Sequence, residues 1–252
     1  MEFLVALEER NRVLFWFGIA NLLSACIMLI LSFTRPLEYG GTNAWHKPIK
    51  FALSTTILSW SMGWYTGYLG KSNDINVFNW ILVITLAFEV IYIGIQAGKG
   101  QASHFNQSTP FHSAMFSLMA VAATLATLAV GYIGVRFFTH SFPALPDYYV
   151  WSIRLGIILF VIFSFEGFAM GAKLAHTVGG VDGSKGLPFL NWSRVLGDLR
   201  VAHFFGMHAL QILPLLSWYL IRDVRLTLVA FFLYGGLAVW VLIQALQAKP
   251  FL

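Results

Sequence analysis

The chain has 252 residues, of which 58% are hydrophobic and only 11% are charged, and its mean hydropathy is +0.72. A soluble globular domain carries about 25% charged residues, so this composition excludes a water-soluble globule, and 23 Phe, 9 Trp and 9 Tyr exclude a disordered chain. The net charge of +5 comes from 16 dispersed Lys and Arg residues, which argues against nucleic-acid binding. We therefore expect an all-α, polytopic membrane helix bundle.

Long apolar runs predict transmembrane helices, because about 20 apolar residues cross the ~30 Å hydrocarbon core of a bilayer. Seven runs qualify, at 13–33, 50–69, 77–97, 111–137, 150–173, 199–221 and 226–246. We expect them to form one seven-helix domain over residues 1–252. Glu2, Glu8 and Glu9 do not fit the basic start of a cleavable signal peptide, so the first span is expected to remain in the mature protein. The sequence shows no evident internal repeat.

The loops divide between two sides of the expected membrane. Side A holds the N-terminus and the loops at 70–76, 138–149 and 222–225, and side B holds the loops at 34–49, 98–110 and 174–198 with the C-terminal tail. Side A carries seven Lys and Arg and side B nine, so the positive-inside rule does not decide between them. Because the side A cations lie in short loops, we expect an integral membrane protein with a cytoplasmic N-terminus.

Three ionisable residues lie deep inside the apolar runs. Glu89 and Glu166 are each about 8 residues, or ~12 Å, from the side B end of their spans, and His208 is at a similar depth. An unpaired ionisable group inside a membrane costs at least ~2.5–3.5 kcal/mol, so such groups normally face the bundle interior with a partner. The sequence therefore predicts a polar chamber open to side B, with Glu89 and Glu166 as candidate catalytic residues.

The first interpretation of this chamber is a metal-centre enzyme. His208, Glu89 and Glu166, completed by His112, His203 or His176, supply nitrogen and oxygen ligands that suit zinc, iron or copper. Such a centre would act on a hydrophobic or lipid-like substrate by hydrolysis or oxidation. Further polar residues are expected around it, namely His46, Gln96, His104, Lys173, His176 and Gln211.

Two alternatives stay open. In a b-type haem protein, His112 and His203 would be the axial ligands, and Arg200 or Lys50 would bind the haem propionates. In a proton-coupled transporter or sensor without catalysis, the buried Glu and His residues would titrate. The five-residue spacing of His203 and His208 turns their rings about 140° apart on a helix, so one ion is not expected to bind both. Expected partners are membrane lipid and a small hydrophobic substrate, and the sequence is also compatible with a homo-oligomer.

Overall fold

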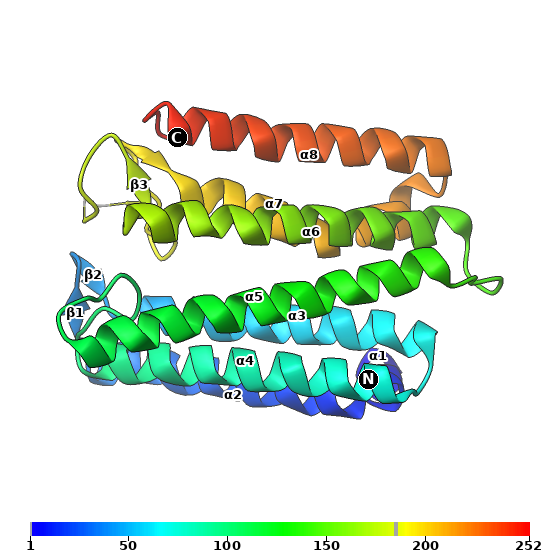
Figure 1. The fold of residues 1–252 in the computed structure, drawn as a ribbon, viewed down its shortest axis with the longest axis horizontal. Helices are drawn as coiled ribbons and strands as arrows, with labels where there is room; N and C mark the ends of the chain where they lie inside the picture. Colours follow the sequence, from blue (N-terminus) through cyan, green and yellow to red (C-terminus); the bar gives the residue numbers. More distant parts are fainter. Residues whose placement is uncertain (1, 184–185) are drawn as a thin grey trace. The chain divides into compact units, whose positions relative to one another are not determined.

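The computed structural model describes residues 2–183 and 186–252, and helices dominate it (Figure 1). The helices are α1 (Glu2–Arg10), α2 (Arg12–Thr34), α3 (His46–Leu69), α4 (Asn73–Gly98), α5 (Pro110–Thr139), α6 (Asp147–Lys173), α7 (Leu199–Leu216), the π-helical turn η1 (Ser217–Ile221) and α8 (Val224–Leu246). Two antiparallel ribbons pair β1 (Glu38–Tyr39) with β2 (Thr42–Asn43) and β3 (Thr177–Val178) with β4 (Gly197–Asp198). Six of the seven expected spans each lie within one helix, and the seventh, 199–221, is divided between α7 and η1.

Within residues 2–183 and 186–252, six helices are long and apolar enough to cross a membrane: α2, α4, α5, α6, α7 with η1, and α8. The chain is thus an all-α integral membrane protein. The expected span at 50–69 lies in α3, which has 24 residues but is less apolar than the six. Its Thr56 and Thr66 hydroxyls are buried and donate to the carbonyls of Ala52 and Met62, one turn earlier. The Thr56 hydroxyl also lies 3.1 Å from the Gly18 carbonyl of α2, so hydroxyl groups that lower the hydropathy of α3 are hydrogen-bonded within the protein.

The contacts divide the chain into two compact units, residues 1–129 and 130–252. In the first unit, α2 and α3 form the most extensive helix pair. The Trp60 indole N–H of α3 donates to the Phe15 carbonyl of α2 at 3.2 Å. Gly18, three residues after Phe15, makes room for the indole ring, because a Cβ at this position would overlap it. A single glycine therefore allows α2 and α3 to approach closely.

The short helix α1 ends at Arg10, and Asn11, with a φ of −152°, separates it from α2. The Asn11 side chain accepts a hydrogen bond from Leu14 N–H and so caps α2. Its amide also donates to Thr66 in α3 at 2.9 Å and to Asn79 in α4 at 2.8 Å. This buried cluster ties together three helices of the first unit at one end.

In the second unit, α6 and α7 pack most extensively and α8 covers both. Glycines set their spacing: a Cβ on Gly156 would lie 2.9 Å from the Ala209 carbonyl oxygen, and one on Gly206 would overlap the Phe163 ring. Helix α7 contains Pro214 and continues into the π-helical turn η1. Its end is consequently less regular than a straight α-helix.

Part of the element order recurs in the two units: a helix, a two-stranded ribbon, a helix, a tight link and a helix describe α2 to α4 and again α6 to α8, whereas α1 and α5 fall outside this order. Strand β1 begins four residues after α2 ends, and β3 begins four residues after α6 ends. A Gly-Gly pair follows each strand, at residues 40–41 and 179–180. The order thus recurs although the sequence shows no evident repeat, because most helix residues differ between the two units.

Candidate functional site

Glu166 of α6 and His203 of α7 form an intramembrane pair in the second unit. The Glu166 side chain is 7% exposed, and its Oε2 lies 3.5 Å from His203 Nδ1. The same Nδ1 lies 2.7 Å from the carbonyl oxygen of Phe163. A carbonyl oxygen can only accept a hydrogen bond, so Nδ1 carries a proton and Nε2 carries either a second proton or a lone pair.

Gly167 explains how the imidazole reaches the backbone of α6. Side chains on a helix lean toward the N-terminal turn, so the residue at 167 would partly cover the Phe163 carbonyl. A Cβ on Gly167 would lie 2.9 Å from His203 Cε1. The glycine therefore leaves the carbonyl open to a ring from the neighbouring helix, directly beside the Glu166 side chain.

The Glu166 carboxyl group is unusual because, among the described residues, neither of its oxygens has a hydrogen-bond partner. Its charged contact is the His203 ring at 3.5 Å, which is longer than a hydrogen bond. Buried carboxylates are normally hydrogen-bonded, because an unpaired charge in a low dielectric is costly. The site thus holds an acid and a base close together with unused acceptor capacity.

His208, placed by the sequence at the depth of Glu166, has different neighbours. Its Nδ1 lies 3.3 Å from Gln211 Oε1, and its ring centroid lies 4.3 Å from that of Phe204. His203 is the histidine that contacts Glu166. Counting residues from the helix ends places His208 at the level of Glu166 only if α6 and α7 end at the same level. In the structure, Gly167 of α6 lies beside His203, in the second turn of α7.

Glu89 of α4 is buried at 8% exposure in the first unit, where it interacts electrostatically with Lys47 of α3. Farther along α4, the Gln96 amide donates to the Tyr92 hydroxyl at 2.7 Å. The sequence analysis did not identify Lys47 as the partner of Glu89, although a lysine close to the start of an expected span is a candidate partner for a buried carboxylate. Because Glu89 belongs to the first unit and Glu166 to the second, the shared chamber remains a prediction.

Two further predicted histidines lie at the start of α5 and in the loop before it. His112, in the first turn of α5, has Nδ1 2.8 Å from the Thr109 hydroxyl. His104 has Nδ1 3.1 Å from the Ser103 hydroxyl, and its ring packs against aromatic rings that include Phe51 and Phe116. Both rings are thus engaged locally.

The predicted propionate ligand Arg200 forms a bidentate pair with Asp198, at 2.9 Å through Nε and 2.6 Å through Nη2. Asp198 is fully buried, caps α7 and accepts from the Ser193 N–H. Arg200 Nη2 also donates to the Asn191 carbonyl. These bonds give the guanidinium a structural role, holding the 186–198 segment against α7. Lys50 and His46 lie in the first turns of α3, and Lys173 ends α6.

His176 lies in the loop after α6, where its ring and backbone N–H are hydrogen-bonded to Asp182. The carboxylate of Asp182 accepts from the His176 ring at 2.7 Å, from the His176 N–H and from the Thr177 hydroxyl. Burial alone would raise the pKa of Asp182, but these hydrogen bonds outweigh it and hold the pKa well below its ordinary value. The sequence did not single out Asp182, because its partners are local and its motif is common in turns.

Metal coordination by three or more residues finds no support in residues 2–183 and 186–252, where no such group of His, Cys, Asp or Glu side chains occurs. The expected ligand set of His208, Glu89, Glu166, His112 and His203 therefore remains a prediction, and the Glu166–His203 pair is the part of it that lies in contact.

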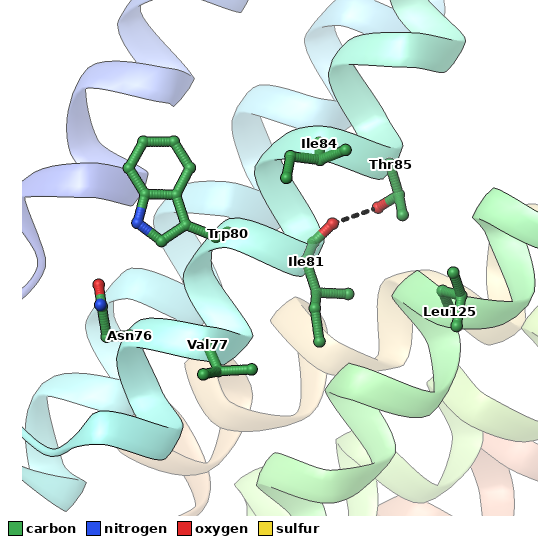
Figure 2. Close-up of a pocket in the computed structure, with 7 residues that line it drawn as sticks. All are labelled: Asn76, Val77, Trp80, Ile81, Ile84, Thr85 and Leu125. Carbon is green, nitrogen blue, oxygen red and sulfur yellow. Dashed lines mark hydrogen bonds between the residues drawn. The ribbon is translucent and has the colours of Figure 1, made fainter.

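A hollow of about 340 Å³ lies on the first unit between α4 and α5 (Figure 2). Its walls are mainly apolar, with Val77, Ile81, Ile84 and Leu125 among them. The Thr85 hydroxyl at its edge already donates to the Ile81 carbonyl. None of the predicted site residues lines this hollow, so it adds no chemistry to the candidate site.

Comparison with models of protein families, with curated proteins and with solved structures finds no significant match for this chain.

Proposed function

We propose that the chain is a proton-coupled membrane protein, a transporter or a sensor, in which Glu166 and His203 share an exchangeable proton. One observation carries this proposal: a buried carboxyl group without hydrogen bonds lies 3.5 Å from an imidazole whose Nδ1 proton is fixed by the Phe163 carbonyl.

The pair has two neutral forms that contain the same number of protons. In one, a Glu166 carboxylate faces a His203 imidazolium, and in the other both groups are uncharged. Adding or removing one proton leaves a net charge inside the membrane, which is costly unless it is compensated. Loss or gain of one proton by the pair therefore changes the attraction between α6 and α7.

Helix α7 is a suitable element to respond to this change. It carries His203 in its second turn, Pro214 farther along, and the π-helical turn η1 at its end. At a proline or a π-helical turn the regular backbone hydrogen bonds are already interrupted, so a helix bends or shifts there more easily than at a regular α-helical turn. The recurring order of elements in the two units also favours a transporter, since many transporters consist of structural repeats.

Infrared difference spectroscopy tests the proton site directly. Spectra of the purified protein, recorded between acidic and alkaline pH, should contain a carboxylic acid C=O band that Glu166→Gln removes. Glu9→Gln is the matched control, because Glu9 is exposed in α1 outside the expected spans. A spectrum from which Glu166→Gln removes no carboxylic acid band would contradict the assignment.

Proteoliposomes distinguish a transporter from a sensor. With a pH-sensitive dye inside the vesicles, a transporter should move protons down an imposed gradient. Glu166→Gln should slow this movement by about a hundredfold or more, the lower end of what a positioned acid or base contributes. A sensor would give the infrared band without proton flux.

A second candidate function is binding of b-type haem or a metal ion through His203. The observation in its favour is the Nδ1 bond to Phe163, since ligating histidines almost always donate their other ring N–H to a backbone or carboxylate oxygen. Hydrolysis or oxidation of a lipid-like substrate would need such a centre. A visible spectrum and metal analysis of the purified protein decide this: a stoichiometric Soret band or a retained metal ion, lost in His203→Ala, would support it.

A further inference from the structure

A second polar site lies at the side A end of α6 in the second unit. A partly open cavity of about 420 Å³ is lined by the loop before α6 and by the start of that helix. Its walls include Ser141, Phe142, Asp147, Trp151 and Arg154. These residues are distinct from the Glu166–His203 pair, so this site does not rest on the proton-coupled function.

The loop that forms one wall is held in place before any ligand binds. The Phe142 ring stacks on Phe137 with centroids 4.8 Å apart, and the Leu145 N–H donates to the Phe142 carbonyl at 3.0 Å. Pro143 and Pro146 further restrict the backbone. The cavity wall therefore needs little ordering when a ligand enters.

Arg154 is positioned with unused hydrogen-bonding capacity. Its Nε donates to the Phe137 carbonyl at 2.9 Å, and its guanidinium lies 5.1 Å from the ring centroid of Trp151. Among the described residues, no hydrogen bond or ion pair engages its two terminal nitrogens. A guanidinium fixed at Nε with both terminal nitrogens available is suited to a phosphate group.

Asp147 adds the opposite charge to the same cavity. It lies seven residues before Arg154, which is nearly two full helical turns, so the two residues lie on one face of α6 with their backbones about 10 Å apart along the axis. The two charged groups interact electrostatically across this distance. Asp147 is exposed and Arg154 is half-buried. A ligand that satisfies both groups carries an anionic and a cationic end separated by a short linker.

We propose that this cavity binds the phosphoethanolamine headgroup of a membrane phospholipid. The phosphate contacts Arg154 and the ammonium group contacts Asp147, while the glycerol end leads toward the apolar surface around Trp151 and Phe138. Trp151 favours a lipid over a soluble ligand, because tryptophan concentrates at the level of lipid headgroups. Phosphatidylethanolamine is preferred over phosphatidylglycerol, which has no cation for Asp147.

Native mass spectrometry of the full-length, delipidated protein tests the proposal, with titrations of phosphatidylethanolamine, phosphatidylglycerol and phosphatidylcholine. Soluble phosphoethanolamine and inorganic phosphate are the probes for a headgroup or anion without acyl chains. We expect phosphatidylethanolamine to bind most tightly and Arg154→Gln to weaken it about tenfold. Asp147→Asn should remove the preference over phosphatidylglycerol.

Arg222→Gln is the matched control, because Arg222 is also a side A cation of the second unit and donates to the Trp218 carbonyl away from the cavity. It should bind phosphatidylethanolamine as the wild type does. Wild-type binding by Arg154→Gln, equal weakening by Arg222→Gln, or inorganic phosphate binding as tightly as the lipid would each overturn the proposal. Should Arg154→Gln fail to fold, Asp147→Asn at the exposed position tests the proposal by itself, because it should lose the preference for phosphatidylethanolamine over phosphatidylglycerol.

Discussion

His203 Nδ1 lies 2.7 Å from the carbonyl oxygen of Phe163, at the place on α6 that Gly167 leaves uncovered. This contact fixes the proton on one ring nitrogen and brings the imidazole within 3.5 Å of Glu166. The chemistry of the pair thus depends on a backbone atom and on the absence of a side chain.

We expect Gly167→Ala to displace the His203 ring, because the new Cβ would lie 2.9 Å from Cε1. Alanine favours a helix over glycine by about 1 kcal/mol, but crowding costs ~1–3 kcal/mol and the lost hydrogen bond about 1 kcal/mol. The net effect should be a destabilisation of about 1–3 kcal/mol, seen as a lower thermal midpoint and an altered Glu166 infrared band.

Gly236→Ala is the control for this substitution. Gly236 lies inside α8, and a Cβ there would meet no atom within 4 Å. Its thermal midpoint should stay the same or rise, as helix propensity dictates. Equal destabilisation by both substitutions would show that the His203 contact is not the cause.

Asn11→Ala should destabilise the first unit more than a typical buried polar substitution. It removes the cap of α2, worth ~0.5–2 kcal/mol, and two hydrogen bonds to Thr66 and Asn79, each worth about 1 kcal/mol. Asn21→Ala is the comparison, because Asn21 is equally buried but donates to the Phe17 carbonyl of its own helix. Chemical denaturation in detergent should give Asn11→Ala a clearly lower free energy of unfolding than Asn21→Ala. A lower value for Asn21→Ala would contradict the role of the Asn11 cluster.

Acid should weaken the loop after α6 through Asp182. Because the pKa of Asp182 is lowered in the folded protein, its charged form adds stability above the ordinary carboxyl pKa, and this is lost as the pH falls toward the folded value. The thermal midpoint of the wild type should exceed that of Asp182→Asn at about pH 6, and the gap should narrow at about pH 3. A gap independent of pH would mean that the carboxylate charge does not stabilise the loop.

The sequence predicted the helices well because apolar runs of this length have few alternatives to a membrane helix. All seven runs lie in helices, although the lower hydropathy of α3 leaves six that qualify as spans. Helix α1 was missed because nine residues with three glutamates give no apolar run. Its structure depends on packing against α2 and α3, which a local pattern does not contain.

The site was predicted less completely than the fold. Charged residues are rare inside the apolar runs, and this identified Glu89, Glu166 and the nearby histidines as candidates. An ionisable group inside a membrane is costly, so its presence there points to a function. Pairing depends on helix register, and the register of α6 against α7 is set by Gly156, Gly167 and Gly206 in contact with the opposite helix. Spacing along one helix cannot reveal such contacts, so depth alone indicated His208 where the structure has His203.

The same use of glycine predicts a strong effect in the first unit. Gly18→Ala places a Cβ that overlaps the Trp60 indole, whose N–H donates to the Phe15 carbonyl. The indole is a rigid ring, so it cannot yield as a flexible chain does, and either the ring leaves the carbonyl or α2 and α3 separate. We expect a loss of ~1–3 kcal/mol in the free energy of unfolding, together with a change in tryptophan fluorescence.

Trp60→Phe removes the donor without the overlap and should cost less, about 1 kcal/mol. In Trp60→Phe, Gly18→Ala should then cost less than in the wild type, because the smaller ring leaves room for the methyl group. Fully additive losses would show that the two residues do not share this contact.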